Sequence, residues 1–105
     1  MIRFEIYAHE SLEKPVVDEL LPVPPDIHDP EGRSGRRFSM IRGVAGRGAS
    51  GTSMGDDIWP ESNIKLILYA SDDEADDIRK SIEKIRAKFP KLGLAVFVTT
   101  GFSEW

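Results

Sequence analysis

The sequence has no cysteine at all, and this absence excludes several kinds of chemistry. Disulfides, thiolate catalysis and cysteine-based metal sites need a residue type that the chain does not contain. The only histidines are His9 and His28, and they lack the paired spacing typical of zinc ligands. Neither histidine has a sequence context that would hold it as a base against Ser50, Ser53 or Ser62. We therefore predict that the protein is not an enzyme and that it has no catalytic residues, no metal site and no cofactor.

Long hydrophobic runs are also missing. No segment approaches the ~18 consecutive apolar residues of a membrane span. Near the N-terminus, Arg3 and Glu5 alternate with apolar residues, unlike the continuous apolar core of a signal peptide. We therefore expect a cytoplasmic protein with no membrane insertion.

Positive charge is too scarce for a general nucleic-acid binder. The formal net charge is −4, whereas binding to a phosphate backbone demands a basic surface. The arginines are nevertheless clustered in one stretch, which holds Arg33, Arg36, Arg37, Arg42 and Arg47. An acidic protein with one local arginine patch suits a small anion better than a nucleic-acid duplex.

The sequence does contain a clear succession of apolar patterns. Its 105 residues correspond to a single domain over residues 1–105. Apolar residues alternate or run together where we predict strands, and recur every three or four positions where we predict helices. The predicted elements are a strand over 2–8, a helix over 11–21, an irregular connection over 22–35, a strand over 37–44, a loop over 43–63, a strand over 64–70, a helix over 72–89 and a strand over 94–99. This βαββαβ order is typical of the α+β, ferredoxin-like fold, in which both helices cover one face of an antiparallel sheet.

Capping residues support the two predicted helix starts. Ser11 can cap the first helix through its hydroxyl group. Ser71 and Glu74 have the spacing of a capping box at the start of the second helix.

The sheet face away from the helices would be exposed in a monomer. Successive side chains of a strand point to opposite faces of the sheet. The last two strands nevertheless have apolar residues at successive positions, such as Leu66 with Ile67 and Val96 with Phe97, and so on both faces. In a chain this short, the simplest cover for such a face is another subunit.

The loop over 43–63 is the most unusual part of the chain, because it holds five of the nine glycines. Glycines let consecutive backbone amides turn toward an anion, and a flanking arginine supplies bidentate charge. The expected ligand-binding residues are Arg42, Gly43, Gly46, Arg47, Gly48 and Ser50. Trp59, Pro60 and Asn63 are expected to form a fixed base under a mobile tip over 49–57. A hairpin tip that is simply flexible accounts for the glycines equally well.

These residues resemble the pattern of the PII-like signalling proteins, a group related to PII and CutA proteins. The pattern comprises Gly-Arg-Gly at 46–48, spaced glycines at Gly51 and Gly55, and Trp-Pro-x-x-Asn at 59–63. The resemblance implies a homotrimer that binds a small anionic ligand between subunits, with an adenine nucleotide as one candidate. It also implies that the loop over 43–63, called the T-loop in the family, reports the ligand state to a partner transporter or enzyme.

The chain departs from true PII proteins at two places. Those proteins carry a second glycine-rich phosphate loop between the second helix and the last strand, where this chain has only Pro90–Gly93. The loop also lacks the tyrosine that some PII proteins modify, because no tyrosine lies between Tyr7 and Tyr69. Nucleotide binding of the usual PII kind therefore lacks one of its expected elements.

Two alternatives remain open. A CutA-like divalent-metal-tolerance protein would bind cations through Asp56, Asp57 or His28. A small enzyme on the same fold would use His28 or His9 as a base.

Overall fold

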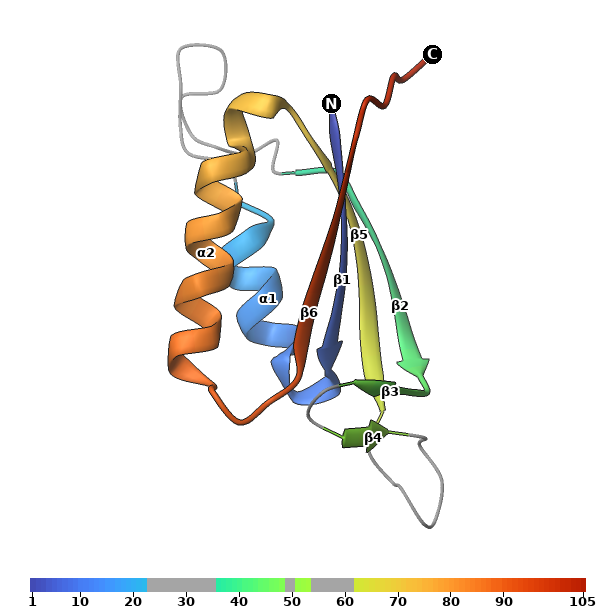
Figure 1. Cartoon of the computed structure of the whole chain (residues 1–105), viewed down its shortest axis with the longest axis vertical. Helices are drawn as coiled ribbons and strands as arrows, with labels where there is room; N and C mark the ends of the chain where they lie inside the picture. Colours follow the sequence, from blue (N-terminus) through green and yellow to red (C-terminus); the bar gives the residue numbers. More distant parts are fainter. Residues whose placement is uncertain (23–35, 49–50, 54–61) are drawn as a thin grey trace.

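The chain folds into a four-stranded antiparallel sheet with two helices packed on one face (Figure 1). The computed structural model describes residues 1–22, 36–48, 51–53 and 62–105, so most of the predicted connection over 22–35 lies outside it. The spatial order of the strands is β2 (Phe38–Val44), β5 (Asn63–Ala70), β1 (Ile2–His9) and β6 (Leu94–Thr100). The helices are α1 (Glu13–Leu20) and α2 (Ala75–Lys88), preceded by the 3-10 turns η1 (Glu10–Leu12) and η2 (Asp72–Glu74). The predicted ferredoxin-like α+β arrangement is confirmed.

β1 occupies the centre of the sheet because its alternating sequence can be buried on one face while both of its edges are paired. The buried residues stand at alternate positions, Ile2, Phe4, Ile6 and Ala8. Ile6 lies opposite Leu66 of β5 on one edge and opposite Val96 of β6 on the other. Since the side-chain period of a strand is two, this register gathers the large apolar side chains on the helix face.

Both helices lie on this apolar face, as Figure 1 shows. The stripe predicted for α2 is confirmed, because Ile78, Ile82 and Ile85 are all buried. The burial of an isoleucine side chain contributes about 2 kcal/mol, so this stripe accounts for much of the attachment of α2 to the sheet. Within the described residues, neither helix combines the length and apolarity needed to span a membrane.

The start of the first helix differs from the prediction. His9, and not Ser11, is the capping residue, since its Nδ1 accepts a hydrogen bond from the backbone N–H of Ser11 at 3.2 Å. The strand runs directly into the η1 turn, so Ser11 is already inside the turn when capping is needed. At η2 the predicted pair is present, and the Glu74 carboxylate accepts a hydrogen bond from the N–H of Ser71 at 3.2 Å.

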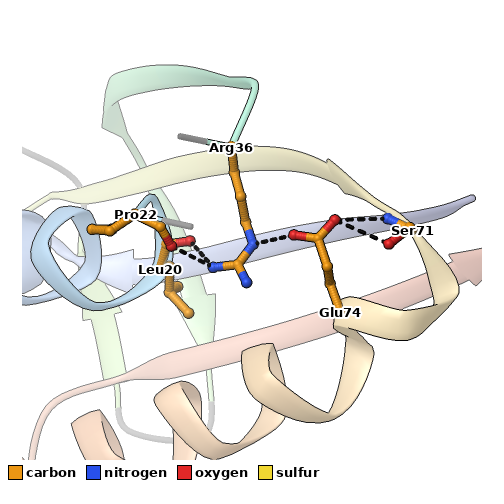
Figure 2. A network of polar contacts seen from close by, with 5 residues as sticks. All are labelled: Leu20, Pro22, Arg36, Ser71 and Glu74. Atoms are coloured by element: carbon orange, nitrogen blue, oxygen red, sulfur yellow. Dashed lines mark hydrogen bonds and ion pairs between the residues drawn. The ribbon is translucent and has the colours of Figure 1, made fainter. Parts of the chain in front are cut away.

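Arg36 is a buried charge between the end of α1 and the start of α2 (Figure 2). Its Nε donates to Oε2 of Glu74 at 2.8 Å. Its Nη1 donates to the carbonyl oxygens of Leu20 and Pro22, at 2.8 Å and 3.0 Å. The backbone N–H of Arg36 also donates to the carbonyl of Leu21 at 2.7 Å. The last carbonyl groups of a helix have no hydrogen-bond donors within the helix. Here Arg36 alone supplies the donors for three carbonyl groups at the end of α1.

The partner of Arg36 is held in its ionised form. Partial burial raises the pKa of Glu74, but hydrogen bonds from Arg36 and Ser71 and the charge of Arg36 outweigh it and lower the pKa. The contact is therefore an ion pair at neutral pH.

The face of the sheet opposite the helices is open in the described part of the chain. Phe97 is 59% exposed on this face and Ile41 is 52% exposed. Tyr7 packs edge-to-face against Phe97, with 5.9 Å between the ring centroids. These residues have the opposite parity to the core residues of their strands, so the apolar residues predicted for this face are present, together with the ion pair of Arg3 and Glu5.

Replacing Arg36 by methionine is expected to lower the free energy of unfolding by about 3 kcal/mol, because the Glu74 carboxylate and two carbonyls lose their donor. Urea unfolding followed by circular dichroism measures this loss. Arg37→Met is the matched control, since Arg37 pairs with Glu104 on the exposed surface and should leave the midpoint nearly unchanged. Equal midpoints for the two variants would contradict the role assigned to Arg36.

Candidate functional site

A β-bulge near the end of β2 marks the point where the chain leaves the sheet. Between Ile41 and Val44, β2 uses one residue more than its partner strand β5. Gly43 has a φ of 72°, a backbone conformation that strongly favours glycine. A bulge bends its strand and locally disrupts the hydrogen-bond ladder, here at Arg42 and Gly43. The first two predicted ligand-binding residues therefore stand where the register between β2 and β5 shifts.

After the bulge, the chain forms a small antiparallel hairpin from β3 (Gly46–Gly48) and β4 (Gly51–Ser53), beyond the ends of β2 and β5 (Figure 1). Arg47 lies opposite Thr52 in this hairpin, and its side chain is exposed. The Gly-Arg-Gly segment, which was predicted to lie in a loop, is thus an extended strand. β4 also lies inside the segment over 49–57 that was predicted to be a mobile tip. Glycine permits many backbone conformations, and pairing between the two strands selects the extended one.

Polar contacts close the base of this loop. Ser62 is buried, and its Oγ donates to Oε2 of Glu10 at 2.9 Å while its carbonyl accepts from the N–H of Glu10 at 3.0 Å. Asn63 lies beside Gly46, because a Cβ added to that glycine would be 3.8 Å from the Asn63 Nδ2. Asn63 therefore stands at the base of the loop, between the main sheet and the hairpin.

Part of the predicted site lies outside the described residues. This applies to Ser50 among the ligand-binding residues and to Trp59 and Pro60 among the base residues. Their proposed roles stay predictions.

Arg42 reaches from the bulge to the first residue of α1. Its Nε donates to Oε1 of Glu13 at 2.5 Å, and its Nη2 donates to Oε2 at 3.2 Å. Two such bonds form the forked arrangement by which guanidinium groups bind carboxylates and phosphates. The hydrogen bond from Arg42 lowers the pKa of Glu13. Desolvation opposes this shift, and the charge of Arg42 adds to it.

Glu13 is the site residue that sequence reasoning missed. It is 29 residues away from Arg42 along the chain, and no motif connects the two. The contact exists because β1 and β2 end on the same side of the sheet, where β1 leads into α1. An acidic residue in the first turn of a predicted helix is common, so it carried no specific signal.

The arginine cluster predicted from the sequence is not a single surface. Arg36 is buried against Glu74, while Arg37 forms a forked pair with Glu104 in the C-terminal tail. Arg36 and Arg37 are neighbours that precede β2, yet their partners lie in η2 and in the C-terminal tail. Among the described arginines of the cluster, those at the loop end of β2 are Arg42 and Arg47.

The two alternative functions find no further support in the described residues. These residues contain no group of three or more acidic or histidine side chains that could hold a metal. His28, Asp56 and Asp57, which the metal hypothesis needs, lie outside the described residues. His9 caps η1, and its Nδ1 lies 2.7 Å from the Oγ of Ser11 within the same cap.

The fold matches solved structures of PII-like proteins. Two structures of CPII, a nitrogen regulatory PII-like protein from Thiomonas intermedia K12, match with a TM-score of 0.66 and 16% identity, over 93% of this chain and 82% of theirs. One is bound to ADP, AMP and bicarbonate, and the other to ADP and bicarbonate. A protein of Thermus thermophilus assigned to the PII-like signalling proteins matches with a TM-score of 0.52 and 18% identity, over 93% of this chain and 83% of that one. No family model and no curated protein matches the sequence. The chain thus has the PII-like fold, as its loop pattern predicted.

Replacing Gly43 by alanine is expected to lower the free energy of unfolding by about 1 kcal/mol, because alanine adopts a positive φ only at a cost. Chemical unfolding measures the change. Gly46→Ala is the matched control, since its φ is not positive and its new Cβ would meet only the side chain of Asn63 at an ordinary distance of 3.8 Å. The assignment of the bulge would be wrong if both substitutions were tolerated equally.

Proposed function

We propose that this chain is a PII-like regulatory protein and not an enzyme. It assembles as a homotrimer and binds a small oxyanion-bearing ligand at the base of the loop over 43–63, with an adenine nucleotide as the first candidate. Binding changes the conformation of the loop and, through it, contacts with a partner transporter or enzyme.

The observation that carries this proposal is the bulge at Arg42 and Gly43. It leads the chain out of the sheet and directly into a hairpin that presents Arg47. Two arginines thus stand at the loop base of a PII-like fold, and the structural neighbour CPII is bound to ADP, AMP and bicarbonate. Guanidinium groups are well suited to the phosphate and bicarbonate groups of such ligands.

The connection between α2 and β6 is too short to bind a phosphate group, so phosphate binding would depend more on Arg42 and Arg47. The N–H of Leu92 donates to the carbonyl of Phe89 at 3.2 Å, and both side chains pack against the core. This turn is tight and offers no glycine-rich loop that could surround a phosphate. The contacts that neutralise a phosphate would therefore have to come mainly from the loop base.

The open face of the sheet supports the trimer. Isolated apolar side chains are ordinary on a protein surface, but Ile41 and Phe97 lie on the same face as Tyr7 and the partly buried Ile67. Glu5 of β1 lies between Ile67 and Phe97 and is paired with Arg3, so the apolar residues of this face form patches beside a charged pair. Exposed apolar patches bordered by polar residues mark interaction surfaces. In a symmetric homo-oligomer, the same face of each subunit supplies the cover for its neighbours.

ADP, AMP, ATP and bicarbonate should be tested by thermal shift and by isothermal titration calorimetry. At a hundredfold excess over its Kd, a ligand stabilises the protein by about 2.7 kcal/mol, which raises Tm by about 10 °C in a domain of this size. Arg47→Ala should weaken binding about tenfold through the loss of a charge-assisted hydrogen bond.

Arg37→Ala is the control for this experiment, because Arg37 lies just before the start of β2 and is engaged with Glu104. It should bind as the unchanged protein does. The proposal fails if none of the four ligands raises Tm, or if Arg47→Ala binds with unchanged affinity.

Phe97→Glu is expected to dissociate the trimer, because it places a new charge among the exposed apolar side chains of this face, beside Tyr7. Sedimentation equilibrium should give three times the chain mass of 11.7 kDa for the unchanged protein and a lower mass for the variant. Val98→Glu is the matched control, because Val98 is the next residue of β6, is 55% exposed and points to the opposite face. A monomer mass for the unchanged protein would overturn the trimer, and dissociation by Val98→Glu alone would assign the contact to the other face.

A further inference from the structure

The guanidinium of Arg42 already holds a carboxylate in the geometry that it would offer to a ligand. Its Nε and Nη2 each donate to a different oxygen of Glu13, at 2.5 Å and 3.2 Å. A phosphate or bicarbonate group recognised by a forked guanidinium needs the same pair of donors. Arg42 therefore cannot keep this contact and present the same two N–H groups to a ligand.

The backbone positions both partners for this contact. Arg42 has the same parity along β2 as Met40, which packs against the core, so it lies on the helix side of the sheet, where Glu13 is the first residue of α1. The positive end of the helix dipole favours a negative charge there, which keeps Glu13 ionised and able to compete. The lowered pKa of Glu13, caused first by the hydrogen bond from Arg42, agrees with an ionised carboxylate at neutral pH.

The exposure of the two side chains distinguishes this pair from the buried one. The Arg42 side chain is 72% exposed and that of Glu13 is 35% exposed, whereas the Arg36 side chain is only 5% exposed. A buried pair cannot be opened without leaving a charge unpaired in the interior. An exposed pair can exchange partners at small cost, because water solvates whichever group is released.

From this geometry we infer that Glu13 is an internal competitor for the ligand of Arg42, so that an oxyanion binds by displacing the Glu13 carboxylate from the guanidinium. This inference rests on the proposed function, because it requires Arg42 to contact the ligand. Only molecules in which Arg42 is released from Glu13 can bind the ligand through this guanidinium. The apparent affinity is therefore the intrinsic affinity multiplied by the fraction of such molecules. Displacement also releases the only side-chain contact recorded between Arg42 and α1 within the described residues, which links ligand binding to the start of that helix.

Calorimetric titration with ADP tests this inference. Glu13→Gln removes the competing charge and should bind ADP about two- to fivefold more tightly than the unchanged protein, as expected for the release of an exposed ion pair. Asp18→Asn is the matched control. It removes one negative charge from the same helix, where Asp18 pairs with Lys14 and not with Arg42, and should leave the affinity unchanged.

A second pair of variants separates direct competition from a general charge effect. In an Arg42→Gln background, Glu13→Gln should give no gain, since the contested donors are gone. A gain that persists in that background, or an equal gain from Asp18→Asn, would overturn the inference in favour of long-range electrostatics. Unchanged or weaker binding by Glu13→Gln, with normal binding by the unchanged protein, would overturn the inference alone. If ADP, AMP, ATP and bicarbonate bind to none of these variants, the proposed function and the inference both fail.

Discussion

The structure depends on the fact that β1 buries one of its two faces and pairs along both of its edges. Its alternate apolar residues meet those of β5 and β6, so the core forms on a single side of the sheet. Both helices then pack their apolar stripes on that side, where the buried core of the described residues lies. The opposite face is left open, and its exposed large apolar residues include Ile41 and Phe97.

The same pairing explains why the candidate site forms where it does. β1 and β2 are both antiparallel to β5, so they run in the same direction and end at the same edge. Asn63 of β5 lies opposite His9 of β1 and opposite Val44 of β2. The bulge, the hairpin and the first turn of α1 are therefore brought together at one end of the sheet. A ligand bound there would contact both the loop that is proposed to signal and the helix that follows the central strand.

The arginines show how the fold redistributes charge. In the sequence they form one basic cluster, but the structure pairs three of them with acids from three different elements, Glu74, Glu104 and Glu13. The buried pair of Arg36 holds the helix ends together, whereas the exposed pair of Arg42 can exchange its partner. Similar chemistry thus serves architecture at one position and, in our proposal, regulation at another. The difference lies in access to water, which decides what it costs to separate the charges.

Prediction from the sequence succeeded where the signal was local and periodic. Alternation identified β1, the three- and four-residue spacing identified α2, and the spacing of Ser71 and Glu74 identified the start of η2. It failed at the first helix cap, where the strand continues directly into a turn and His9 takes the place expected for Ser11. The β3–β4 hairpin was also missed, because glycine-rich residues have no preferred conformation until they are paired.

By itself, the sequence determined the order of the main elements, the parity of each strand and the PII-like pattern of the loop, since these follow from residue type and spacing along a few consecutive turns or strand positions. Only the tertiary structure decided which acid pairs with each arginine and where β2 carries its bulge. Those contacts join residues such as Arg42 and Glu13, which are 29 positions apart. They are set by the strand register and the packing of α1, and no short stretch of the chain contains that information.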